Sequence, residues 1–113
     1  FSNFLVMNKA IPFHLKHKKA NPDLVTRSTA MNAGWLWQIP LQERIGAGYV
    51  FNDNFINETQ ALDELEKHLK QKIDPITTLS FEAGFYKTVW NKNVLAIGLA
   101  SGFVEPLEAT SIG

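Results

Sequence analysis

Short runs in which apolar residues take every second position recur along the chain, and this period of two is typical of β-strands. The clearest run spans residues 45–51, where one face carries Ile45, Ala47, Tyr49 and Phe51. Similar runs predict strands or extended pieces at residues 1–6, 9–15, 24–31, 35–41, 76–81, 85–90 and 94–97. The connections between them are short, which favours antiparallel pairing because parallel strands need long crossovers.

One stretch has the period of an α-helix instead. Its apolar residues recur every three to four positions and form one stripe, made of Ala61, Leu62, Leu65, Leu69 and Ile73. We expect a helix over residues 57–73, with Asn57 as its N-cap and Gln60 completing a capping box. Glu64 and His68 stand four apart and are predicted to pair on the solvent side. A helix that covers a sheet explains this stripe, and a helix that docks a partner is the alternative.

These elements predict an α+β fold with a mostly antiparallel sheet of about five strands and one covering helix. Turns are expected at residues 52–54, 83–84 and 91–93, which are rich in Asn and Gly. Residues 94–97 are apolar on both faces, so we expect this last strand to be buried.

The segment after that strand predicts a tight turn and then a new helix. Gly98, Ala100, Ser101 and Gly102 are small, which suits a sharp turn or a close approach by another group. Pro106 lies between Glu105 and Glu108, and proline with acidic neighbours suits the first turn of a helix over residues 103–111. The free amides at such a helix start can hold an anion.

Composition limits the classes of function. The chain has 113 residues with eleven acidic and eleven basic side chains, so no global field attracts nucleic acid or an anionic membrane. It contains no cysteine, which excludes thiolate metal sites and is typical of a cytoplasmic protein. No apolar run approaches the length of a membrane span, about 20 residues. His14 and His17 lack a third ligand nearby, so we expect no metal site.

The residues alone leave the candidate chemistry open. Glu105 and Glu108 are either a paired acid and base or carboxylates that balance a helix dipole. Trp35 and Trp37 share one strand face and are either a packing pair or a platform for a ligand. The Gly-x-Gly at Gly46 lacks the third glycine of a dinucleotide-binding fingerprint.

Two motifs resemble flavin-dependent halogenases of the tryptophan halogenase family. Residues 96–112, AIGLASGFVEPLEATSI, resemble the segment that carries the catalytic glutamate of that family, and residues 35–40, WLWQIP, fit its W-x-W-x-I-P motif. The resemblance runs from about residue 9 to residue 112 and covers a middle portion of such an enzyme. It implies that residues 1–113 are part of the FAD and substrate domain of a larger flavoenzyme with a monooxygenase-like α/β fold. The nucleotide-binding part, the helical carboxy-terminal part and the catalytic lysine would then lie outside this chain.

The resemblance also implies an activity. Such enzymes use reduced FAD, oxygen and chloride or bromide to halogenate an electron-rich aromatic substrate such as tryptophan or an indole. A flavin reductase supplies the reduced FAD, and the enzyme is expected to be cytoplasmic, with no nucleic-acid or membrane partner. The alternatives are a flavin monooxygenase-like protein and a binding module without chemistry. Residues 1–113 on their own are expected to bind FAD poorly and to be inactive.

The same resemblance assigns roles to individual residues. Glu108 matches the catalytic glutamate, and Trp35 and Trp37 match side chains that form a wall between substrate and flavin. Backbone amides of Thr110 and Ser111 are expected to hold the halide. The residues expected beside the flavin are Gly98, Leu99, Gly102, Pro106, Thr110 and Ser111.

Overall fold

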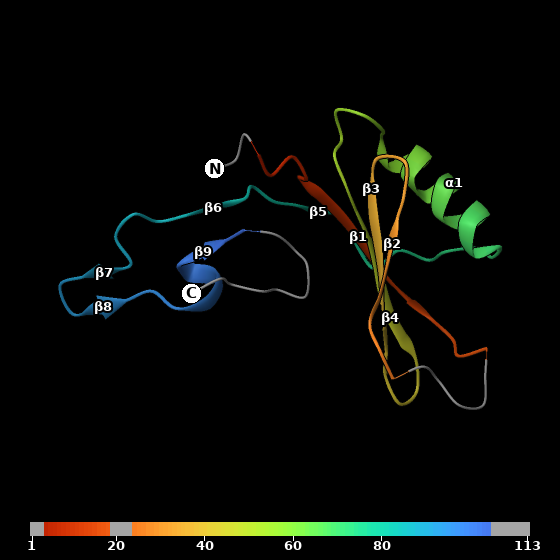
Figure 1. Ribbon diagram of the computed structural model, residues 1–113, viewed down its shortest axis with the longest axis horizontal. Coiled ribbons are helices and arrows are strands. Elements are labelled where there is room, and N and C mark those ends of the chain that lie inside the picture. Colours follow the sequence, from red (N-terminus) through yellow and green to blue (C-terminus); the bar gives the residue numbers. More distant parts are fainter. Residues whose placement is uncertain (1–3, 19–23, 105–113) are drawn as a thin grey trace. The chain divides into compact units, whose positions relative to one another are not determined.

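The largest of the described sheets has five antiparallel strands (Figure 1). The computed structural model describes residues 4–18 and 24–104. The strands lie in the order β2-β3-β4-β1-β5. Their bounds are β1 (Lys9–Leu15), β2 (Arg27–Ala30), β3 (Gly34–Pro40), β4 (Ile45–Phe51) and β5 (Leu79–Ser80). The predicted antiparallel sheet of about five strands is therefore confirmed.

Two units make up the chain. Residues Asn8–Ser80, here called the sheet unit, contain the sheet and the helix α1 (Glu58–Leu69). Residues Phe1–Met7 and Phe81–Gly113 form the second unit. Its described elements are β6 (Gly84–Phe85), β7 (Trp90–Asn91), β8 (Val94–Leu95), the 3₁₀ helix η1 (Gly98–Ala100) and β9 (Gly102–Phe103). Within the second unit β6 pairs with β9 and β7 with β8, both antiparallel.

Helix α1 begins as the sequence predicts. The Asn57 side chain accepts a hydrogen bond from the Gln60 amide at 2.9 Å, and the Gln60 side chain accepts one from the Asn57 amide at 3.0 Å, which completes the capping box. The helix ends at Leu69, four residues before the predicted end at residue 73, because Lys70 adopts a left-handed conformation with φ of 55°. The Lys70 amide there donates to the Glu66 carbonyl and stops the helical pattern.

One face of the sheet carries the hydrophobic core. Alternate residues of the three long strands meet α1 on this face. The fully buried members of this core are Ile11, Phe13, Leu36, Tyr49 and Phe51 from the strands and Ala61 and Leu65 from α1. The register joins these positions across the sheet, since Tyr49 lies opposite Ile11 on one side and Leu36 on the other. The predicted apolar stripe of α1 therefore does cover the sheet.

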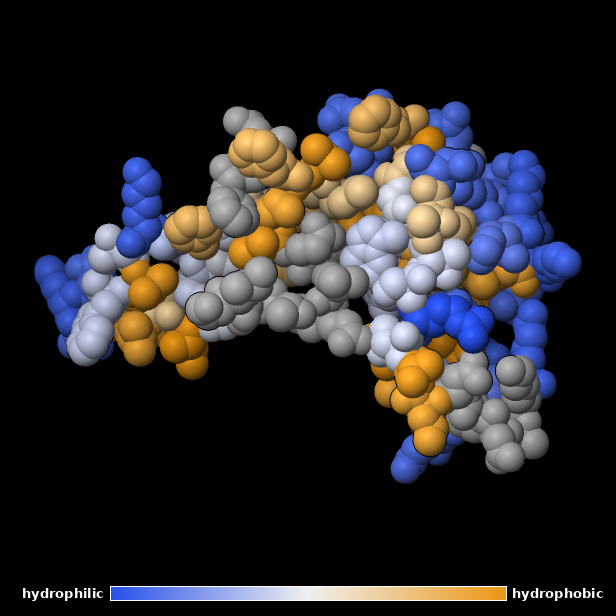
Figure 2. Space-filling model, in the orientation of Figure 1, coloured by the Kyte–Doolittle hydropathy of each residue, from blue (hydrophilic) through white to orange (hydrophobic). Residues whose placement is uncertain are grey.

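Two predictions in the second unit need correction. Residues 83–84 do not form a turn, because Gly84 begins β6. The apolar run at residues 94–97 forms only the two-residue strand β8, and Val94 and Leu95 are 64% and 54% exposed. Hydrophobic atoms are visible at the surface in the region of the β7–β8 hairpin (Figure 2). β8 pairs only with the equally short β7 in the described part of the chain, so this hairpin has no second layer to bury its side chains.

The strand predictions near the amino terminus and before the Trp strand also need correction. Residues 4–8 are not a strand, and residues 1–3 lie outside the described residues. The strand predicted over residues 24–31 is limited to Arg27–Ala30. Glu64 does not pair with His68, because its carboxylate accepts hydrogen bonds from the Asn32 amide and the Tyr49 hydroxyl.

Candidate functional site

A tight turn precedes β9 in the second unit. Gly98 begins η1 with φ of 58°, a left-handed conformation that glycine adopts readily. The hydroxyl and the amide of Ser101 both donate to the Gly98 carbonyl, at 2.7 and 2.9 Å. Among the described residues other than its two chain neighbours, none has an atom within 4 Å of the position that a Cβ of Gly98 would take. The predicted turn is confirmed, and it leaves open space beside Gly98.

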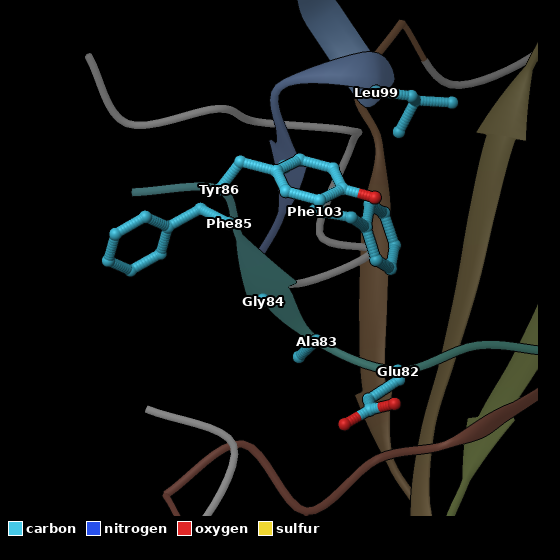
Figure 3. Close-up of a pocket in the computed structure, with 8 residues that line it drawn as sticks. Glu82, Ala83, Gly84, Phe85, Tyr86, Leu99 and Phe103 are labelled. Carbon is cyan, nitrogen blue, oxygen red and sulfur yellow. The ribbon is translucent and has the colours of Figure 1, made fainter. Parts of the chain in front are cut away.

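A hollow of about 300 Å³ lies next to this turn (Figure 3). Its lining is mainly apolar and aromatic and consists of Glu82, Ala83, Gly84, Phe85, Tyr86, Leu99, Gly102 and Phe103. The Tyr86 ring reaches toward Phe103, and Glu82 lies at the other end of the hollow (Figure 3). Phe103 packs edge to face against Phe81, with ring centroids 5.2 Å apart. Such a lining suits a flat aromatic group better than a charged one.

The walls of the hollow are held together by strand pairing. Gly102 lies opposite Phe85, and a Cβ at Gly102 would lie 2.6 Å from the Cβ of Phe85. The Tyr86 amide donates to the Ser101 carbonyl at 3.0 Å, which extends the pairing by one bond. The strand contact thus explains why position 102 is a glycine.

The structure brings together some of the predicted site residues. Leu99 and Gly102 line the hollow, and Gly98 begins the turn beside it. The predicted helix over residues 103–111 does not include Phe103, which belongs to β9. Four predicted residues lie outside the described part of the chain: Pro106, Glu108, Thr110 and Ser111.

Segment 82–86, which forms the opposite wall, was not among the predicted site residues. The signal that could have found it is a repeated Gly-Phe pair, since Gly84-Phe85 in β6 faces Gly102-Phe103 in β9. Gly102 permits the close approach of the two strands, and the two phenylalanines supply apolar surface.

The two tryptophans of β3 lie together in the sheet unit. Their ring centroids are 6.0 Å apart and the planes are inclined by 55°. Leu36 between them points to the opposite face and is fully buried in the core. The prediction that Trp35 and Trp37 share a face is therefore confirmed. Both indoles are partly buried, and neither belongs to the core beneath α1.

Charged groups of the sheet unit pair with one another. The Lys9 ammonium lies 3.1 Å from the Glu58 carboxylate and 3.6 Å from that of Asp53. The hydrogen bond to Glu58 in particular raises the pKa of Lys9. His17 places Nε2 2.6 Å from the Leu41 carbonyl.

Within residues 4–18 and 24–104, no group of three or more His, Asp or Glu side chains is arranged to hold a metal ion. None of the helices in this part of the chain combines the length and hydrophobicity needed to pass through a bilayer.

Comparison with known sequences gives a consistent set of relatives. A family model described as tryptophan halogenase matches residues 1–113. The uncharacterized protein y4xG of Sinorhizobium fredii is 43% identical over 109 residues, which cover 96% of this chain and 21% of y4xG. Tryptophan 7-halogenase KtzQ of Kutzneria sp. is 35% identical over 117 residues, which cover 98% of this chain and 22% of KtzQ.

Comparison with solved structures points to the same family as the sequence relatives. BrvH, a flavin-dependent halogenase from Brevundimonas sp. BAL3, matches 98% of this chain and 23% of its own with a TM-score of 0.86 and 39% identity. Xcc4156, a flavin-dependent halogenase from Xanthomonas campestris, matches 96% of this chain and 22% of its own with a TM-score of 0.86 and 37% identity. The chain thus spans about a fifth of the length of these relatives. Since the family model covers every residue and the fold agrees, this chain belongs to the tryptophan halogenase family.

Proposed function

We propose that the intact protein containing residues 1–113 is a cytoplasmic flavin-dependent halogenase, and that these residues form part of its FAD and substrate domain. It would use reduced FAD, oxygen and chloride or bromide to halogenate an electron-rich aromatic compound such as tryptophan or an indole, with a flavin reductase supplying reduced FAD. The observation that carries this proposal is the agreement in fold and sequence with BrvH, at a TM-score of 0.86 and 39% identity.

The described residues fit one side of a flat cofactor. The hollow beside η1 offers about 300 Å³ between aromatic side chains and the turn, and the space beside Gly98 is open. We propose that Gly98, Leu99, Gly102 and Pro106 contact the flavin ring. FAD when bound supplies the redox chemistry that turns halide and oxygen into a halogenating species. The apolar lining of the hollow would keep bulk water away from that ring.

The polar part of the proposed site comes from residues outside the described part of the chain. We propose that backbone amides of Thr110 and Ser111 bind the halide, since amides at a helix start attract anions. Glu108 would hold its carboxylate near the aromatic substrate. There it would stabilise the positive charge that develops on the ring during halogenation and accept the proton that the ring loses.

The tryptophan pair has a different proposed role. Trp35 and Trp37 present two large apolar faces on the side of the sheet away from α1. We propose that they separate the organic substrate from the flavin and take no part in bond making. Their half-buried state suits a wall, because indoles fully embedded in the core could not face a ligand.

The test uses the intact protein with a flavin reductase, NADH, FAD, oxygen and either chloride or bromide. L-tryptophan and indole serve as probes, and mass spectrometry detects the halogenated product. Glu108→Gln is expected to lower the rate by about a hundredfold or more while FAD binding is retained. Glu105→Gln, three positions away, is the matched control and is expected to have a much smaller effect.

Three results are distinguishable. A halogenated product that depends on Glu108 supports the proposal. Hydroxylated product without any dependence on halide would indicate a flavin monooxygenase and refute it. Absence of both FAD binding and turnover would indicate a binding module and would refute it as well.

A further inference from the structure

The six-membered ring of Trp37 lies directly on the backbone of β4. The register places Trp37 of β3 opposite Gly48 of β4. A Cβ atom at Gly48 would lie within 3.0 Å of three ring carbons of Trp37, namely Cη2, Cζ2 and Cζ3. A real side chain does not tolerate such a separation, so the ring can take this position only because residue 48 has no side chain.

The two glycines of the Gly-x-Gly sequence differ in this respect. Gly46 lies two residues earlier on the same strand and the same face. A Cβ at Gly46 would have the Ile39 carbonyl oxygen as its nearest neighbour, at 3.9 Å, which is an ordinary contact. Neither glycine has a positive φ, since Gly98 is the one described glycine with that conformation. The requirement at position 48 is therefore for space and not for an unusual backbone.

The position of the Trp37 ring also determines its relation to Trp35. With the six-membered ring of Trp37 against Gly48, the two ring centroids are 6.0 Å apart at an inclination of 55°. A methyl group at position 48 would lift or rotate the Trp37 ring, because the ring is the far end of a side chain and moves more easily than the sheet backbone. The spacing and angle between the indoles would then change.

We propose that Gly48 is a positioning residue, which holds the Trp37 indole against the sheet so that Trp35 and Trp37 form one fixed aromatic surface. This inference rests on the proposed function for its catalytic consequence, because there the tryptophan pair separates substrate from flavin. Gly48 itself contacts Trp37 and acts only through it. An aromatic wall that is displaced by even about 1 Å can cost two orders of magnitude in rate.

The direct test is spectroscopic and needs no flavin. Two indoles this close and inclined couple their transitions and give an exciton couplet in the far-ultraviolet circular dichroism. Trp37→Phe in the intact protein assigns the couplet to this pair. Gly48→Ala is expected to abolish or invert the couplet, and the matched control Gly46→Ala is expected to leave it unchanged. An unaltered couplet in a folded Gly48→Ala protein would overturn the inference.

A double-mutant cycle covers the case in which Gly48→Ala folds poorly. If the clash is with the Trp37 ring, Gly48→Ala should lower Tm by about 4 °C or more in the parent and by less than about 1 °C in a Trp37→Ala background. Equal losses in both backgrounds, or failure of the double variant to fold while Trp37→Ala folds, would place the clash elsewhere and refute the proposal.

The catalytic consequence is measured separately. With L-tryptophan as probe, Gly48→Ala is expected to reduce halogenated product per reduced FAD consumed by about tenfold, while Gly46→Ala stays near the parent. If the parent protein halogenates nothing, the proposed function fails, but the couplet and the cycle still decide the role of Gly48. If both variants halogenate like the parent although the couplet changes, the positioning role in catalysis is refuted.

Discussion

The hydroxyl of Tyr49 joins the core of the sheet unit to the turn between β2 and β3. The Tyr49 side chain is fully buried, and its hydroxyl donates to Glu64 Oε2 at 2.8 Å. The Ala33 amide donates to the same hydroxyl at 3.4 Å, and the Asn32 amide donates to Glu64 Oε1 at 2.8 Å. Helix, strand and turn therefore meet at one polar contact in an otherwise apolar region.

Tyr49→Phe tests the strength of this contact. The substitution removes one oxygen and keeps the ring, whose centroid lies 5.4 Å from that of the Phe51 ring. A hydrogen bond to a charged acceptor contributes about 1.5–3 kcal/mol, and partial exposure of Glu64 reduces this, so we expect a loss of about 1–2 kcal/mol. This loss corresponds to roughly a five- to thirtyfold rise in the fraction of molecules in which the turn is open.

Amide hydrogen exchange of the intact protein measures this loss locally. The amides of Asn32 and Ala33 should exchange about tenfold faster in Tyr49→Phe, since the turn opens without global unfolding. Tyr86→Phe removes a hydroxyl from an exposed tyrosine of the second unit and should leave these amides unchanged. If the exchange rates of these amides rise by less than about twofold in Tyr49→Phe, the contact adds little to stability and the reasoning is refuted.

The same contact predicts a dependence on alkaline pH. Burial, and then the hydrogen bond to Glu64, raises the pKa of Tyr49 well above its ordinary value. In the unfolded chain tyrosine ionises near pH 10, so the contribution of Tyr49 is complete below that pH and declines above it. The difference in Tm between the parent and Tyr49→Phe should therefore narrow as the pH rises from about 9 to 11. If the Tm difference stays constant over this pH interval, the raised pKa of Tyr49 in the folded protein is contradicted.

Three further substitutions test the sheet unit, each by thermal unfolding followed by circular dichroism. Gly34→Ala should be severely destabilising, by about 3 kcal/mol or more, because its Cβ would overlap the Val50 carbonyl oxygen in the neighbouring strand; a soluble variant with unchanged Tm would refute this. Asn57→Ala removes half of the capping box and should lower the free energy of unfolding by about 1 kcal/mol, whereas Asn57→Ser should keep most of this stability. Leu65→Ala empties a fully buried position and should cost about 2–5 kcal/mol, whereas a cost below about 1 kcal/mol would mean that α1 is not packed as described.

Periodicity predicted the sheet unit well because burial there follows from local pattern. The strands Lys9–Leu15 and Ile45–Phe51 have the predicted bounds, and the N-cap Asn57 is where its capping partner indicated. The end of α1 was wrong because the apolar stripe continues to Ile73, which is buried without being helical. Ile73 is held there by its amide, which donates to Glu66 Oε1 at 3.2 Å. A buried position thus does not by itself extend a helix.

Prediction was weaker in the second unit, where pairing joins short segments. An apolar run such as Val94–Leu95 shows a tendency to be buried, but sequence does not say which surface would bury it. The hollow is formed by segments 82–86 and 99–103, which meet through the pairing of β6 with β9. No local signal gives that pairing except the repeated Gly-Phe sequence. The roles of Glu108, Thr110 and Ser111 remain predictions from the family resemblance.

The glycines show why residue type alone does not reveal function. Gly98 is needed for its left-handed backbone, and Gly102 for the close approach of Phe85 in the paired strand. In both cases the constraint is on the backbone, so no change in another side chain can relieve it. At Gly48 the constraint comes from the movable ring of Trp37, and a smaller side chain at position 37 would remove it. A glycine whose need depends on one partner side chain serves the position of that partner. This dependence separates Gly48 from Gly46, which the sequence presents as an equivalent glycine two residues away.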